Sequence, residues 1–145
     1  MTPAWLWDDE AVPNDDVLYK HTPCGDKQRK RQDPTTGKWH LTKAAFTRSE
    51  LTAGGWSCFR QTLLFNLGLD VHAVRDSGTS PRDAWRLLVG QVRSSGAGVT
   101  DEEDPLLGQL GKAHAQIRLT SSVPSRSDIT RVRSELIDVF TFCED

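Results

Sequence analysis

One eight-residue segment places the strongest constraint on how this chain can fold. Residues 112–119, KAHAQIRL, alternate between apolar and polar side chains. A period of two sends successive side chains to opposite faces of a sheet, so this pattern predicts a β-strand. Its apolar face should pack inward. Its other face should present three polar side chains together: His114, Gln116 and Arg118.

The middle of the chain, residues 38–66, gathers aromatic, β-prone and nucleophile-type side chains. Alternation over 39–45 predicts one strand, and the glycine pair at 54–55 breaks the chain before a second one. Residues 56–62 carry large side chains on both faces, which is typical of a strand covered on both sides. A helix over 56–66 is the alternative, although the short length and the aromatic content favour the strand.

The remaining patterns predict further strands and two helices. Residues 16–22 alternate as a first strand, and 97–100 are typical of a short one. Ser80 and Pro81 carry helix-start signals, so a helix is expected over 81–93, with a buried stripe of Ala84, Trp85, Leu88 and Val92. A second amphipathic helix is expected over 128–142. The predicted fold is α+β: one small mixed or antiparallel sheet of about 4–5 strands packed by these two helices.

Composition and length limit the class of protein. We expect a single α+β domain over residues 16–145, preceded by an acidic, tryptophan-bearing segment over 1–15. The net charge of −2 creates no global field for nucleic acid or anionic membranes. The three cysteines form no disulfide framework, and no apolar run approaches the roughly 20 residues of a membrane span. Without a secretion signal at the start, a cytoplasmic location is expected, with no membrane partner.

Five side chains could converge on chemistry if the strands are neighbours. The candidate catalytic set is His114, Lys20, His40 and Ser57, in which a histidine could act as general base for the serine. Arg60, with Lys20 and His114, could instead bind a phosphate or carboxylate group. No carboxylate at a recognisable spacing completes a triad. A histidine that is simply hydrogen-bonded on a sheet face is the plainer interpretation of His114.

Three other features are candidates for binding. The basic loop that contains Lys27, Arg29, Lys30 and Arg31 could contact nucleic acid, although a solvated loop is the simpler interpretation. The acidic run at 101–104 is expected to be solvated as well. Trp5 and Trp7 should either pack on the domain or bind a partner.

Four side chains could in principle bind zinc: His21, Cys24, His40 and Cys58. They lack a second paired knuckle, so neither a metal nor any other cofactor is expected.

The order of several short motifs resembles that of uncharacterised bacterial domains of this size. The motifs are Leu18-Tyr19-Lys20, Ala45-Phe46, Ser57, Ser80-Pro81 with Ala84-Trp85, and the Ala-His-Ala-x-Ile pattern at 113–117. Such domains often have arginine at the position of Lys20, and the basic stretch 24–37 is an insertion relative to them. The resemblance implies a single α+β domain from a bacterial source, and it implies no activity.

Three hypotheses for function follow. The leading one is a small non-catalytic interaction or regulatory module of a bacterial multi-protein system, of defence or toxin–antitoxin type, with a larger protein as partner. The alternative is a small enzyme that acts on nucleotides or nucleic acid through His114 with Lys20, Arg60 or His40. The third is nucleic-acid binding through the basic loop at 27–31. The pattern indicates no particular oligomeric state.

Overall fold

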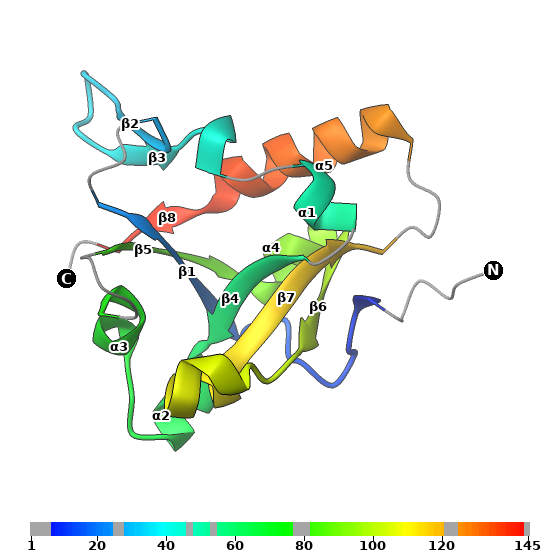
Figure 1. Cartoon of the computed structure of the whole chain (residues 1–145). Helices are drawn as coiled ribbons and strands as arrows, with labels where there is room; N and C mark the ends of the chain where they lie inside the picture. The colour runs from blue at the N-terminus through cyan, green and yellow to red at the C-terminus, as the bar shows by residue number, and fades with distance from the viewer. Residues whose placement is uncertain are drawn as a thin grey trace.

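A six-stranded antiparallel sheet is the central layer of the structure (Figure 1). The computed structural model describes residues 7–24, 28–45, 48–52, 55–76, 82–120 and 125–143. In spatial order the strands are β6 (Ala97–Asp101), β7 (His114–Leu119), β4 (Trp56–Arg60), β1 (Val17–Pro23), β5 (Arg82–Leu88) and β8 (Thr141–Phe142). Strands β2 (Lys30–Gln32) and β3 (Trp39–Leu41) form a separate antiparallel pair. The α+β prediction is therefore confirmed, but the main sheet is larger than expected.

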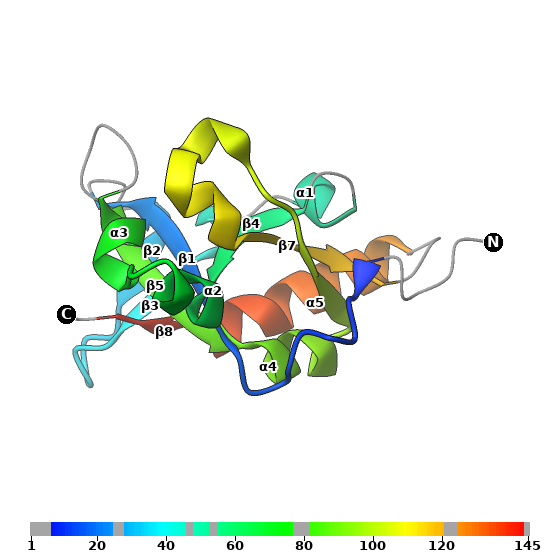
Figure 2. The ribbon, with the colours of Figure 1, turned by 90° about the horizontal axis from the view of Figure 1, so that it is seen from below.

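Helices cover both faces of this sheet (Figures 1 and 2). One face packs against α1 (Arg48–Thr52), α4 (Val89–Ser94) and the long α5 (Arg126–Val139). The other face is covered by shorter elements: α2 (Gln61–Asn66), α3 (Val71–Arg75) and the 3₁₀ segment η3 (Pro105–Ala113). A short 3₁₀ turn, η2 (Lys43–Ala45), follows β3. Because both faces are covered, polar side chains on either face need partners inside the protein.

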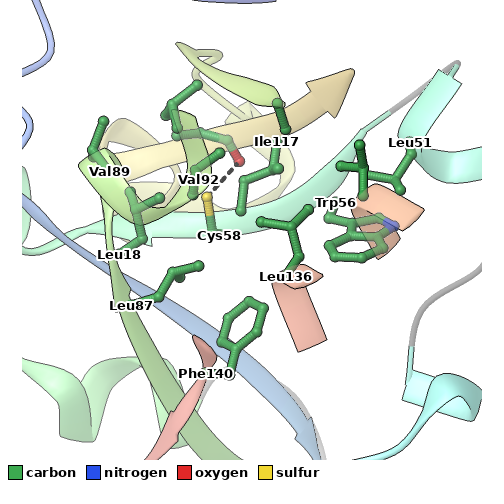
Figure 3. Packing of buried hydrophobic residues seen from close by; sticks show 14 of the residues in the cluster. Leu18, Leu51, Trp56, Cys58, Leu87, Val89, Val92, Ile117, Leu136 and Phe140 are labelled. Atoms are coloured by element: carbon green, nitrogen blue, oxygen red, sulfur yellow. Dashed lines mark hydrogen bonds between the residues drawn. The ribbon is translucent and has the colours of Figure 1, made fainter. Parts of the chain in front are cut away.

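The larger apolar core lies between the sheet and α5 (Figure 3). Trp56 and Cys58 of β4 lie on the α5 side of the sheet, where Leu136 and Phe140 also pack. Leu136 and Trp56 are fully buried. Ser125 caps α5 by accepting a hydrogen bond from the Asp128 backbone N–H (3.1 Å). The helix ends at Val139, because Phe140 turns to an extended conformation that leads into β8. The prediction of helix to residue 142 was therefore wrong at its end.

The predicted helix over 81–93 is wrong for residues 82–88 and correct only for its last part, where α4 (Val89–Ser94) begins. Residues 82–88 form β5, which pairs with β1 along its whole length and with β8 on its other side. Ala84, Trp85 and Leu87 are all buried. Ala84 and the exposed Leu88 lie on the other face from Trp85, so the apolar residues do not alternate, and Ala84, Trp85 and Leu88 match a helical stripe by chance. Ser80 and Pro81, the expected start signals, lie outside the described residues.

The other strand predictions hold with shifted ends. The strand predicted over 39–45 stops at Leu41 and continues as the η2 turn. Residues 56–66, for which strand and helix were the two predictions, contain both: strand β4 is followed directly by helix α2. The alternation at 112–119 correctly predicts β7. However, its polar face is covered, and His114 and Arg118 are only 5% and 8% exposed.

Residues 7–16 form a strap that closes the β6 edge of the sheet. The Asp9 N–H donates to the Val99 carbonyl (2.8 Å), and the Asp8 carboxylate accepts from the Val99 N–H (3.2 Å). Arg93 of α4 donates from Nε to both oxygens of Asp8 (3.0 and 3.1 Å). Gly98 is needed at the crossing, since a Cβ there would lie 2.3 Å from the Trp7 carbonyl oxygen. The strap covers the edge strand β6, which would otherwise leave backbone N–H and C=O groups unpaired.

The position of the apolar core predicts that truncating one leucine lowers stability strongly and that truncating another lowers it little. Leu136→Ala should lower the free energy of unfolding by about 3 kcal/mol, because the substitution leaves a cavity between α5 and the sheet. Leu106→Ala is the control, since Leu106 is 93% exposed, and it should change stability by less than about 0.5 kcal/mol. Urea unfolding followed by far-UV circular dichroism measures both. Equal effects would contradict the assignment of the core to the α5 side.

Candidate functional site

His114 and Ser57 lie on the same face of the sheet, the face under α2, α3 and η3. Phe59 pairs with His114 and Ser57 pairs with Gln116, so all four side chains share one face. Ser57 and His114 are then diagonal neighbours, with Cα atoms roughly 7–8 Å apart. The structure therefore brings two of the predicted catalytic residues into one region.

Two histidines flank the Phe59 ring on this face. His114 meets it edge-on at 5.6 Å between ring centroids, and His21 stacks on it at 6.0 Å. His114 Nδ1 lies 2.7 Å from the Glu102 carbonyl oxygen. Because a carbonyl only accepts, Nδ1 must carry the proton, and Nε2 is then the acceptor nitrogen in the neutral ring. His21 was considered only as a zinc ligand, although the alternation in 16–22 already placed it on the same face as Tyr19.

The His21 imidazole is held neutral. Burial, followed by the positive charges of Lys20 and Arg82, lowers the pKa of His21 from its ordinary 6.5 to about 4. Arg82 NH1 lies 3.1 Å from His21 Nδ1, and a guanidinium can only donate, so Nδ1 is the acceptor. Protonation of His21 would remove this hydrogen bond and place two cations side by side.

Lys20 and Arg60 face the opposite side of the sheet from His114 and Ser57. Leu18 pairs with Arg60 in the β1–β4 register, and Lys20 follows Leu18 by two residues, so all three point toward the α5 side. Burial lowers the pKa of Lys20, while Cys58 and Glu50 act in the opposite direction. The full set of predicted catalytic residues therefore does not share one face.

Cys58 is a structural thiol. It is fully buried, and burial raises the pKa of its thiol to about 12. Its Sγ donates to the Ala115 carbonyl at 3.5 Å, as the dashed line in Figure 3 shows. A thiol that remains protonated at neutral pH is a poor nucleophile and a poor metal ligand.

Arg60 is the centre of an ionic clamp with two aspartates, of which Asp16 is buried and Asp101 is exposed. Its Nε donates to Asp16 (2.8 Å) and its NH1 donates to Asp101 (2.6 Å). Thr62 donates to the second oxygen of Asp16 (2.8 Å). The clamp ties the end of the strap to β4 and β6. The guanidinium predicted to bind an anion thus already has two carboxylate partners.

A second ionic group joins the acidic run to β7. Arg118 forms an ion pair with Glu102, and its guanidinium lies 4.8 Å from the Trp7 ring centroid. The hydrogen bond from Arg118, the largest cause, lowers the pKa of Glu102. Asp104 accepts from the Leu106 N–H (3.0 Å) at the start of η3. The expectation that 101–104 is solvated is therefore correct only in part: Asp101 and Glu103 are exposed, but Asp101 and Glu102 also form ion pairs with arginines. The short strand predicted over 97–100, directly before this run, is the sequence signal that could have revealed these contacts.

The remaining candidates lie on the β2–β3 hairpin or beyond the described residues. His40 is in β3, opposite the exposed Arg31. Lys30 Nζ contacts Asp83 of β5 (2.7 Å) and lies 4.8 Å from the Trp39 ring centroid, so it fixes the hairpin to the sheet. Arg29 has interactions of its own. Lys27 and Trp5 lie outside the described residues.

The described ranges can be assessed for metal ligands and for helices that could cross a membrane. No three side chains of the His, Cys, Asp or Glu type gather there as possible metal ligands. No helix in these ranges combines the length and the apolar character needed to cross a bilayer.

Comparisons with protein-family models, with curated proteins and with solved structures found no match for this chain. The proposed function therefore rests on the sequence and the geometry of this chain.

Removing the centre of the clamp should cost much more stability than removing an exposed ion pair. Arg60→Met should lower the free energy of unfolding by roughly 3 kcal/mol, because Asp16 would remain buried without its cation. Arg131→Met is the matched control, since the Arg131–Glu135 pair is about half exposed (54% and 46%), and it should cost at most about 0.5 kcal/mol. Chemical denaturation of both variants provides the comparison. Similar losses of stability in the two variants would show that the clamp does not stabilise the fold.

The low pKa of His21 predicts how stability depends on pH. The unfolded chain binds a proton on His21 near pH 6.5 and the folded chain only near pH 4. The contribution is thus fully present above pH 6.5 and is lost as the pH falls through this window toward 4. His21→Gln should make the stability less dependent on pH between 6.5 and 4. Urea midpoints at several pH values test this, and an NMR titration of His21 near pH 6.5 would refute it.

Proposed function

We propose that this protein is a small non-catalytic interaction module that docks on a larger protein. Two observations support a binding role over a catalytic one. The candidate catalytic side chains lie on two faces of the sheet and on the hairpin. Arg60 and Arg118 also serve in ion pairs that hold the fold together. A bacterial multi-protein system of defence or toxin–antitoxin type is the proposed setting, and only the resemblance supports that part.

An exposed apolar surface on α2 and η3 is the observation that carries the proposal. Leu106 is 93% exposed, Phe65 is 58% exposed and Leu107 is 39% exposed. The two elements pack against one another, and Gln109 of η3 donates to the Leu67 carbonyl just after α2 (3.4 Å). Grouped, exposed apolar side chains of this size are typical of protein interfaces. The partner we infer presents a complementary apolar face to this α2–η3 surface.

A small enzyme is the alternative that one observation favours. The Glu102 carbonyl orients His114 so that Nε2 can accept a proton, and Ser57 lies on the same face. The burial of His114 weighs against this alternative, because a substrate would have to reach a side chain that is 5% exposed under η3. The exposed α2–η3 surface needs no such rearrangement.

Substitutions of exposed leucines test the interaction surface. Leu106→Asp should abolish capture of the partner from source-cell extracts while the protein stays folded, because a carboxylate would be buried at the interface without a cation. Leu88→Asp is the matched control, since Leu88 is 41% exposed and belongs to β5, outside the two elements of the proposed surface. Quantitative mass spectrometry of tagged-protein captures gives the measurement. A partner retained by both variants, or lost from both, would overturn the assignment of the surface.

A further inference from the structure

A small pocket with aromatic walls lies between the hairpin, β8 and the end of α5. Its volume is about 300 Å³, and its lining includes Trp39 and His40 from β3, Phe142 from β8 and Asp138 from α5. Figure 1 shows these three elements meeting on the side of the sheet opposite α2 and α3. This pocket is therefore separate from the α2–η3 surface.

The aromatic wall of this pocket is fixed by buried contacts. Trp39 and Phe142 rings contact each other at 6.5 Å between centroids, and Phe142 meets Trp85 edge-on at 5.0 Å. Trp85 is fully buried, and its indole N–H donates to Thr22 (2.9 Å). The wall is thus preformed, so a ligand would not have to order it.

The end of α5 gives this pocket a negative side. The last turn of the helix contains no basic residue, and Asp138 lies in it as an exposed side chain. The terminal carbonyl groups of a helix add partial negative charge at this end, where a carboxylate is unfavourable unless a cation joins it. Among the described residues, no ion pair involves Asp138. The electrostatics therefore favour a bound cation.

We propose that this pocket binds an arginine side chain of the partner protein. A guanidinium is planar, stacks on aromatic rings and pairs with a carboxylate through two parallel hydrogen bonds. The pocket combines the two features that this group recognises, the Asp138 carboxylate and the Trp39–Phe142 wall, although Lys30 Nζ already lies 4.8 Å from the Trp39 ring centroid. Arginine is also enriched in protein interfaces. The inference rests on the proposed interaction role, but it concerns a different face of the molecule.

Lys38 provides the competing explanation. It also lines the pocket, so a carboxylate ligand could bind there instead. Lys38 and Asp138 are both exposed, so solvent screens both charges. The partial negative charge at the end of α5 adds to that of Asp138 and favours the cation, and matched cationic and anionic probes separate the two cases.

Binding of small arginine and carboxylate probes to the purified protein tests the proposal. N-acetyl-arginine amide should shift the Trp39 indole N–H resonance in ¹H–¹⁵N NMR spectra, with a dissociation constant on the order of 1 mM. The neutral citrulline analogue should bind at least about 10-fold more weakly, and so should arginine to Asp138→Asn. Glu135→Gln removes the same charge one turn earlier and should leave binding within about 2-fold, because Glu135 does not line this pocket and its charge is screened before it reaches the ligand.

The outcomes decide between the explanations. Equal binding of the citrulline analogue, no loss in Asp138→Asn, or no shift at all would overturn the arginine site. Binding of N-acetyl-aspartate amide that depends on Lys38 would replace it with an anion site. Arginine binding without any Leu106-dependent partner would refute the α2–η3 surface alone. A Leu106-dependent partner without arginine binding would refute the pocket alone.

Discussion

The need to cover both faces of a six-stranded sheet is the constraint on which this structure depends. In the described part of the chain α5 is the longest helix, and it covers one face of the sheet together with α1 and α4. The other face is covered by α2, α3 and η3, which are each shorter and less regular. Short elements bury one side of themselves and leave the other side in solvent. The exposed leucines of η3 and Phe65 of α2 are therefore a by-product of this coverage, and they provide the surface through which a partner could dock.

The same coverage explains the roles of the charged residues. Arg60 and Arg118 lie on strands whose two faces are both covered, so each needs a carboxylate partner within the protein. Asp16, Asp101 and Glu102 supply these partners from the strap and from the end of β6. Several side chains that look catalytic in the sequence are thus part of the framework. What remains for binding is at the periphery, on α2 and η3 and in the pocket beside Asp138.

Local sequence patterns were sufficient to predict several of the strands and the final helix. The alternation at 112–119 and at 16–22 correctly predicted β7 and β1, because a period of two is a property of the strand itself. The Ser125 cap and the apolar stripe of α5 were equally local signals. The strand β5 was missed for a physical reason. Trp85 and Leu87 form its buried face, but Ala84 and the exposed Leu88 lie on the other face, so its apolar residues do not alternate, and Ala84-Trp85 with Leu88 also fits a helix.

The amino-acid sequence by itself determined the α+β class, the position of the final helix and the alternation that sends His114 and Lys20 to defined sides of their strands. The tertiary structure alone decided which strands are neighbours, and hence that Lys20 and Arg60 lie on the opposite face from His114 and Ser57. It also decided that the acidic run pairs with arginines and that Trp39, Phe142 and Asp138 line one pocket. The reason is that alternation is a local property of the chain, whereas strand order and pairing depend on contacts between segments far apart in the sequence.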